Sequence, residues 1–233
     1  MNHLKAIAFD ADDTLWHTEN LFQDVQKELS SILDQYAPHE EVQNRLHQTE
    51  MKNITLFGYG VKGFTLSMIE TAIEISEQKV TAADIHKIVM LGKGILDSPL
   101  TLIHGVRDVL ETLGQQYRLF LITKGDVLDQ TNKIGKSGLE NLFEQTEVVQ
   151  EKDVNTYATL FGSLDVAPEN LAMVGNSMKS DILPIIELGG AGIYIPYQVT
   201  ARFEVIDEDI ADGNLYQLNQ ITELPEFLRT KTI

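Results

Sequence analysis

The sequence predicts an α/β fold: a doubly wound parallel sheet into which an all-helical domain is inserted. Three observations predict it. Short apolar segments alternate with helical patterns over most of the chain, a long stretch near the N-terminus shows only helical spacing, and polar motifs follow several of the apolar segments. Alternation of this kind is typical of right-handed crossovers between parallel strands.

Five short apolar segments, bounded by Gly, Asp or Lys, predict parallel strands that are covered on both faces. They are residues 4–9, 118–123, 146–150, 171–174 and 192–196. Helical patterns between the later strands cover residues 106–113, 127–136, 156–164 and 180–188. In such a sheet we expect the chemistry at the carboxyl ends of the strands.

The stretch between the first two strands predicts a separate helical domain, which we call the cap. Apolar residues recur there at helical spacing, as in Leu21, Val25, Leu29 and Leu33, and no convincing strand is present. Pro99 supplies a breaker at its end. The predicted cap therefore covers residues 17–98, and the predicted core domain covers residues 1–16 and 99–233.

Composition restricts the possible partners. The 233 residues carry a formal net charge of -17, which disfavours nucleic acid and anionic membrane surfaces as partners. The chain has no cysteine, so disulfides and thiolate chemistry are excluded. The N-terminal apolar run is interrupted by Asp10 and does not suit a signal peptide, and no run is long enough to span a membrane. We expect a cytoplasmic protein.

Carboxylates follow the first predicted strand directly, in the segment FDADDTLW. Carboxylates are almost never buried without a partner, so a cluster at a strand end suggests a bound cation or catalysis. Asp10 and Asp12 are separated by one residue, so both can face a single site where the chain leaves the strand.

Polar residues also follow three further strands. Thr123 and Lys124 precede a helix and suit an anion, and Lys152 is a point cation able to reach a phosphate. Asn176 and Asp181 follow the fourth strand and add an amide oxygen and a carboxylate. Because the carboxyl ends of parallel strands meet at one edge of a sheet, we expect these groups to converge.

The four elements DADDT, LITKGD, the Lys of QEKD and VGNSMKSDI resemble, in order and spacing, those of the haloacid dehalogenase superfamily. The resemblance covers residues 1–16 and 99–200, and that superfamily places a helical cap where the insert lies. The site roles that the resemblance implies are Asp10 as nucleophile, Asp12 as general acid and base and as a metal ligand through its carbonyl, Thr123 and Lys152 as phosphate anchors, and Asn176 and Asp181 as metal ligands.

Phosphomonoester hydrolysis explains why these residue types are needed. An anion must attack an anion, and Mg²⁺ held by carboxylate oxygens relieves that repulsion. Asp10 would ligate the ion through one oxygen and attack phosphorus with the other, forming an aspartyl phosphate. Lys124, like Lys152, is a predicted phosphate ligand. The expected cofactor is Mg²⁺ and the expected partner is a small phosphorylated substrate.

Asp12 favours phosphoryl chemistry over dehalogenation, because halide release needs no acid to protonate a leaving alkoxide. Two alternatives stay open: a phosphotransferase of the phosphoglucomutase type and a non-catalytic phosphate-binding relative. Asn176 stands where the superfamily commonly has Asp, so we expect weaker Mg²⁺ binding. Whether Asn176 or Asp181 is the direct ligand, the substrate and the oligomeric state are left open.

Residues 58–63 fit the pattern G-x-G-x-x-G, but no strand pair of the kind that dinucleotide binding requires flanks them. We interpret the segment as a glycine-rich cap loop that faces the active site. Tyr59, Lys62 and Phe64 are candidates for substrate contact on this interpretation.

Overall fold

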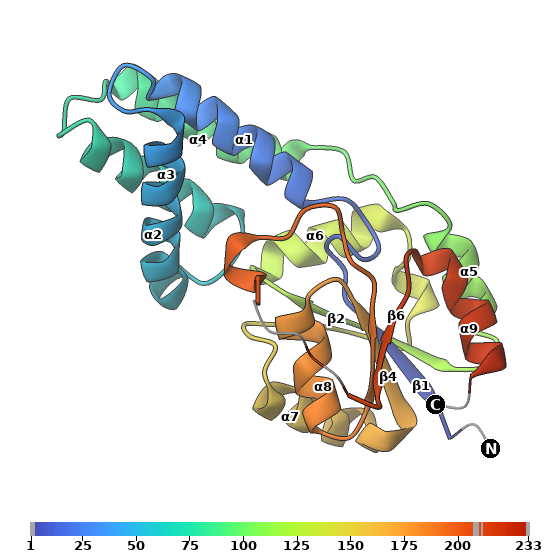
Figure 1. The fold of residues 1–233 in the computed structure, drawn as a ribbon. Coiled ribbons are helices and arrows are strands. Elements are labelled where there is room, and N and C mark those ends of the chain that lie inside the picture. The colour runs from blue at the N-terminus through green and yellow to red at the C-terminus, as the bar shows by residue number, and fades with distance from the viewer. Residues whose placement is uncertain (1–2, 207–209, 211, 232–233) are drawn as a thin grey trace. The chain divides into compact units, whose positions relative to one another are not determined.

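The computed structural model describes residues 3–206, 210 and 212–231 (Figure 1). The chain divides into two compact units. The first contains residues 1–17, 100–124 and 130–233, and the second contains residues 18–99 and 125–129. We call the first the core unit and the second the helical unit, and each is described by itself.

The core unit is built on a six-stranded sheet of order β3-β2-β1-β4-β5-β6, in which all pairs of neighbouring strands are parallel. This is the strand order of a doubly wound α/β fold. The strands are β1 (Ala6–Phe9), β2 (Arg118–Lys124), β3 (Gln145–Val149), β4 (Leu171–Gly175), β5 (Ala191–Tyr194) and β6 (Leu215–Gln217). The predicted fold class is therefore confirmed.

Helices cover both faces of the sheet, as the apolar runs of the strands require. Ile7 and Phe9 on one face pack with α5, α6 and α9, whereas Ala6 and Ala8 on the other face pack with α7 and α8 (Figure 1). The helices are α5 (Val106–Leu113), α6 (Val127–Ser137), α7 (Val154–Leu164), α8 (Leu183–Glu187) and α9 (Leu224–Thr230). The central strands are consequently buried on both sides.

The strand register brings the carboxyl ends of β1 and β4 together, and β2 continues beyond them to Lys124. Phe9 lies opposite Leu121 of β2 and Val174 of β4. Because the three strands are parallel, the chain leaves the sheet after each of them at the same edge, where Asp10 follows β1 directly.

Two parts of the core unit differ from the sequence-based expectation. Strand β6 was not predicted, because a three-residue edge strand carries too little pattern to detect. Helix α9 was not predicted either. The helix predicted over residues 180–188 is instead a π-helical turn, Met178–Ile182, followed by α8. The π-turn begins at Ser177, whose side chain accepts a hydrogen bond from the main-chain N–H of Ser180.

The helical unit contains α1 (Glu19–Ile32), α2 (His39–Phe57), α3 (Val61–Ile75) and α4 (Ala82–Asp97). Their apolar faces bury a common core that includes Leu29, Leu46 and Met68. The loop in the G-x-G-x-x-G segment is shorter than the predicted loop over residues 58–63. Helix α3 begins at Val61, so only residues 58–60 connect α2 to α3. Gly58 and Gly60 have positive φ angles of 73° and 105°, which glycine adopts without strain.

No helix among the described residues is long and apolar enough to cross a membrane. A cytoplasmic location stays a prediction.

Two leucines on α2 test the core of the helical unit. Leu46 is 1% exposed, whereas Leu56 on the same helix is 75% exposed. Replacing Leu46 with Ala is expected to lower the free energy of unfolding by about 2–5 kcal/mol, because it leaves a cavity. The matched Leu56→Ala variant is expected to change it by less than about 0.5 kcal/mol, as measured by urea denaturation. Equal losses in both variants would contradict this packing.

Candidate active site

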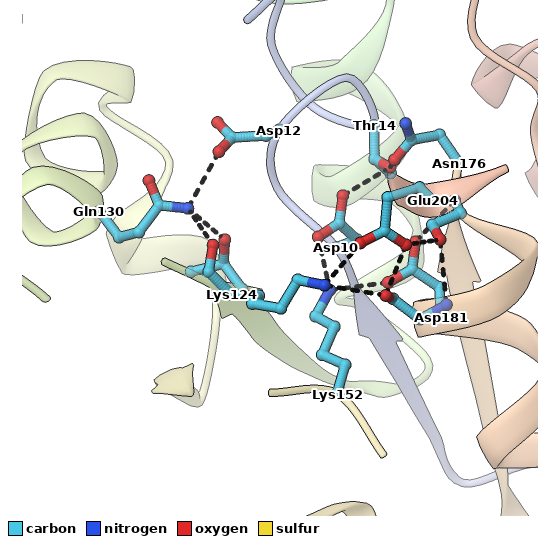
Figure 2. A network of polar contacts seen from close by, with 12 residues as sticks. Asp10, Asp12, Thr14, Lys124, Gln130, Lys152, Asn176, Asp181 and Glu204 are labelled. Atoms are coloured by element: carbon cyan, nitrogen blue, oxygen red, sulfur yellow. Dashed lines mark hydrogen bonds and ion pairs between the residues drawn. The ribbon is translucent and has the colours of Figure 1, made fainter. Parts of the chain in front are cut away.

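Three buried charged side chains form the centre of the site (Figure 2). Lys152, which follows β3, donates to Asp10 Oδ1 at 2.5 Å and to Asp181 Oδ1 at 2.7 Å. Asp10, Lys152 and Asp181 are only 7%, 4% and 1% exposed. The structure therefore brings together three predicted site residues from the ends of three different strands.

The charges of this cluster do not balance, since two carboxylates share one lysine. Burial alone would lower the pKa of Lys152, but Asp10 and Asp181 outweigh it and raise that pKa well above its ordinary value. Burial raises the pKa of Asp10 from 3.8 to about 7, an effect that Lys152 opposes and that Asp181 and Asp12 reinforce. Lys152 is therefore protonated, and Asp10 takes up a proton more readily than an ordinary aspartate does.

Hard oxygen atoms converge on the other side of Asp10. Thr14 Oγ1 donates to Asp10 Oδ2 at 3.0 Å. The amide nitrogen of Asn176 donates to the same Asp10 oxygen at 3.2 Å and to the main-chain oxygen of Asp12 at 3.1 Å. In this orientation the amide nitrogen faces the Asp10 carboxylate oxygen and the Asp12 carbonyl oxygen. With the amide turned over, its Oδ1 would take that place and would be the third hard donor. Such a donor set fits Mg²⁺.

No group of three or more His, Cys, Asp or Glu side chains among the described residues is arranged to hold a metal ion. The candidate set combines one carboxylate, one main-chain carbonyl and one amide instead. Asp181 is engaged elsewhere, since its Oδ1 accepts from Lys152 and its Oδ2 from the main-chain N–H of Ser177 at 2.9 Å. Asn176 is therefore better placed than Asp181 for direct ligation.

The side chain of Asp12 is held by three donors. Oδ1 accepts from Trp16 Nε1 at 2.7 Å, Oδ2 accepts from Gln130 Nε2 at 3.0 Å, and Lys133 Nζ lies within 3.1 Å of both oxygens. These donors suit an ionised carboxylate, because each of them supplies a proton to an acceptor. One of these hydrogen bonds to Asp12 must break before the Asp12 carboxylate can carry a proton itself.

Gln130 and Lys133 are site residues that sequence reasoning missed. Gln130 is 2% exposed, and its amide nitrogen also donates to Thr123 Oγ1 at 2.6 Å, whereas its Oε1 is buried without a partner. Both side chains come from α6, three residues apart and hence on one face of the helix. That spacing, on the helix directly after a strand-end motif, was the available signal.

Thr123 lies at the site, but Lys124 is directed toward carboxylates. Its Nζ lies 2.5 Å from Glu204 Oε1 and 3.2 Å from Glu151 Oε1. Thr123 is 1% exposed and contacts Gln130. A role for Lys124 as a phosphate ligand stays a prediction, and it would require the side chain to leave these partners.

The three cap candidates for substrate contact have different surroundings within the helical unit. Phe64 is buried in the hydrophobic core of that unit, with its ring 5.0 Å from the ring of Phe22. This burial does not favour contact with a substrate, which stays a prediction. Lys62 Nζ pairs with Asp126 Oδ2 at 2.9 Å. For Lys62 and for Tyr59, a substrate role stays a prediction.

A parallel α/β sheet with an Asp–Lys–Asp cluster at its carboxyl edge agrees with the fold and the strand-end motifs of the family that the sequence resembles. A model of the haloacid dehalogenase-like hydrolase family matches residues 4–189. The chain belongs to that family and is a hydrolase, as the resemblance of its four motifs implied.

The similar proteins include two curated relatives and one solved structure. A glyceraldehyde 3-phosphate phosphatase of Pyrococcus furiosus is 24% identical over 97% of this chain and 95% of its own length. The enzyme of that name from Methanothermobacter thermautotrophicus is 25% identical over 97% of this chain and 100% of its own length. A haloacid dehalogenase-like hydrolase from Xanthomonas campestris has a TM-score of 0.87 and 39% identity, covering 98% of this chain and 91% of that chain.

Gly175 leaves room for Asp181. A Cβ atom at position 175 would lie 2.2 Å from Asp181 Oδ2 and 2.4 Å from its Cγ. Gly175→Ala is therefore expected to displace the buried carboxylate and to lower the free energy of unfolding by about 1–3 kcal/mol. Gly162→Ala in α7 is the control, since its Cβ would meet nothing within 4 Å. Gly162→Ala is expected to raise the free energy of unfolding by about 0.5–1 kcal/mol, because alanine is favoured over glycine within a helix. Urea denaturation measures both, and destabilisation by Gly162→Ala alone would contradict the assignment.

The raised pKa of Asp10 predicts how stability depends on pH. The folded protein binds the Asp10 proton with a pKa of about 7, against 3.8 for the unperturbed group. Between these values the folded state holds more protons than the unfolded state, so the free energy of unfolding falls as pH rises and levels off above about 7. In Asp10→Asn this fall is expected to disappear, because the remaining pair of Lys152 and Asp181 is neutral. Thermal unfolding across this range in metal-free buffer tests it, and an unchanged pH slope would contradict it.

Proposed function

We propose that this protein is a Mg²⁺-dependent phosphatase that hydrolyses small phosphomonoesters through an aspartyl-phosphate intermediate on Asp10. The observation that carries the proposal is the pairing of Asp10 Oδ1 with Lys152 at 2.5 Å, while Oδ2 lies beside the Asn176 amide, which also contacts the Asp12 carbonyl. The two oxygens of one carboxylate thus face different partners. One oxygen is suited to attack and the other to ligation.

Asp10 performs the first step as the nucleophile. An oxygen of its carboxylate forms a bond to phosphorus while the bond from phosphorus to the ester oxygen of the substrate breaks. The deeply buried Lys152 holds the attacking carboxylate in place and balances negative charge on the transferring phosphoryl group. The Thr123 hydroxyl, at the end of β2, is suited to bind a phosphate oxygen.

Mg²⁺, when bound by Asp10, the Asp12 carbonyl and Asn176, would supply the positive charge that lets one anion approach another. The chain contributes the ligands and their orientation. Thr14 supports this orientation, because its hydroxyl donates to the Asp10 oxygen that faces Asn176.

Asp12 moves the protons. It gives a proton to the departing alkoxide in the first step and takes one from the water that attacks the aspartyl phosphate in the second. The second step releases phosphate and restores the carboxylate of Asp10. The donors from Trp16, Gln130 and Lys133 suit the ionised form that the second step needs. The first step requires Asp12 to release one of them.

The substrate is proposed to be a small phosphorylated metabolite. Two relatives that align with 97% of this chain are named glyceraldehyde 3-phosphate phosphatases. A phosphorylated three-carbon aldehyde is therefore the first substrate to test, beside sugar phosphates and phosphorylated small acids.

Phosphate release from p-nitrophenyl phosphate and from a panel of phosphomonoesters tests the proposal. We expect turnover that requires Mg²⁺ and is lost on chelation. Asp10→Asn is expected to abolish it, and Asp12→Asn is expected to reduce kcat by about 10²–10⁴-fold, because proton transfer to and from the reacting groups is lost.

Two outcomes would count against the proposal. Activity that survives in Asp10→Asn would overturn the assignment of the nucleophile. Formation of a phosphate isomer without phosphate release would instead identify a phosphotransferase.

A further inference from the structure

A buried carboxylate outside the four sequence motifs lies at the site. Glu204 ends a short helical turn, Arg202–Glu204, in the connection that follows β5, and its side chain is only 11% exposed. Other contacts hold this connection to the core unit. Lys179 Nζ donates to the main-chain oxygen of Phe203 at 2.8 Å, and His17 Nδ1 lies 2.6 Å from the Tyr197 hydroxyl.

Both oxygens of Glu204 accept hydrogen bonds from site segments (Figure 2). Oε1 accepts from Lys124 Nζ at 2.5 Å, across 80 positions of sequence. Oε2 accepts from the hydroxyls of Ser177 at 2.5 Å and Ser180 at 2.6 Å. One carboxylate thus joins the end of β2 to the π-turn that follows β4.

Glu204 is ionised in this position. Burial would raise its pKa, but the charge of Lys124 and the hydrogen bonds from Lys124, Ser177 and Ser180 outweigh burial and lower it. Lys124 also donates to Ser180 Oγ at 3.0 Å, so the four side chains form a closed network. A network of this kind holds its members more rigidly than separate pairs would.

The π-turn held by Glu204 is linked to the groups around Asp10, since Asn176 lies just before it and Asp181 lies within it. Ser177 directly follows Asn176, and the main-chain N–H of Ser177 donates to Asp181 Oδ2 at 2.9 Å. The other oxygen of Asp181 accepts from Lys152, which in turn holds Asp10. A shift of Ser177 would therefore reach both the candidate metal ligand Asn176 and the nucleophile.

We infer that Glu204 is a positioning residue of the active site, which acts through Lys124 and through Ser177 and Ser180. Its carboxylate keeps Lys124 away from Asp10 and keeps the Ser177–Asp181 turn in place. Lys152 is then the only cation that the described residues place on Asp10. This role rests on the proposed phosphatase function, but the contacts themselves do not.

Glu204→Gln is the sharpest variant, because it keeps the shape of the side chain and removes its charge. The amide nitrogen would meet donors where the carboxylate had only accepted. With p-nitrophenyl phosphate we expect kcat to fall by about 10- to 100-fold, the loss typical when a residue that orients metal ligands is replaced. KM for this phosphomonoester is expected to change much less.

A second measurement does not depend on turnover. Stabilisation of the protein by MgCl₂ and inorganic phosphate, followed by thermal unfolding, is expected to need higher concentrations in Glu204→Gln than in the parent. Glu144→Gln is the matched control, since Glu144 also pairs with a cation, Arg118 at 2.6 Å, but has a half-exposed side chain and no contact with the site motifs that the structure describes. We expect its kcat and its response to Mg²⁺ to match those of the parent.

The outcomes separate positioning from a structural role. A lower unfolding temperature in Glu204→Gln with parent-like kcat and parent-like Mg²⁺ response would overturn the inference. If Glu204→Gln does not fold, Glu204→Asp replaces it, because that variant keeps the charge on a shorter side chain. Reduced kcat with nearly unchanged KM in Glu204→Asp would support the inference, and parent-like values would overturn it.

A failure of the phosphatase proposal can be told apart from a failure of the positioning role of Glu204. If the parent hydrolyses no phosphomonoester, the phosphatase proposal fails. The positioning role then stands if Glu204→Gln alone loses the stabilisation by MgCl₂ and phosphate while Glu144→Gln keeps it. It falls if both variants respond as the parent does.

Discussion

The buried cluster of Asp10, Lys152 and Asp181 is the constraint on which the rest of the site depends. Charges are buried in proteins only when they are paired, and removing one partner leaves an uncompensated charge. Here one lysine serves two carboxylates, and burial, reinforced by the charge of Asp181, raises the pKa of Asp10 to about 7 although Lys152 opposes it. Uptake of a proton or of another cation at Asp10 is therefore favoured in this buried cluster.

The parallel sheet brings this cluster together at little cost. Phe9, Leu121 and Val174 lie side by side, so residues far apart in the sequence leave the sheet at one edge. The apolar strands are rigid because helices cover both faces. Side chains on short connections after such strands are held more accurately than side chains on long loops. The connection after β5 is longer, and it is held at the site by the contacts of Glu204.

Much of the core unit could be predicted from sequence, because β1, β2, β4 and β5 have near-continuous apolar runs and because four polar motifs follow strands in order. Asp10 and Lys152 were predicted for this reason. Sequence reasoning did not predict Gln130, Lys133 and Glu204. Each is a polar residue outside a recognisable motif, and its role depends on which segments meet in three dimensions. Phe64 was predicted to contact substrate because an aromatic residue beside glycines suggested a loop, whereas it lies on the buried face of α3.

The charges of the site also explain why the lysines alone do not suffice for phosphate chemistry. Lys152 pairs with Asp10 and Asp181, Lys124 with Glu204 and Glu151, and Lys133 with Asp12. These described pairs set three cations against five carboxylates, so a phosphate dianion would enter a region that is already negative. Favourable binding then requires further positive charge near Asp10. Asp10 Oδ2 and the Asp12 carbonyl oxygen both face the Asn176 amide, and with that amide turned over the three groups would present oxygens to a divalent cation. The excess of carboxylates therefore supports the proposed Mg²⁺ requirement on grounds independent of the resemblance to other enzymes.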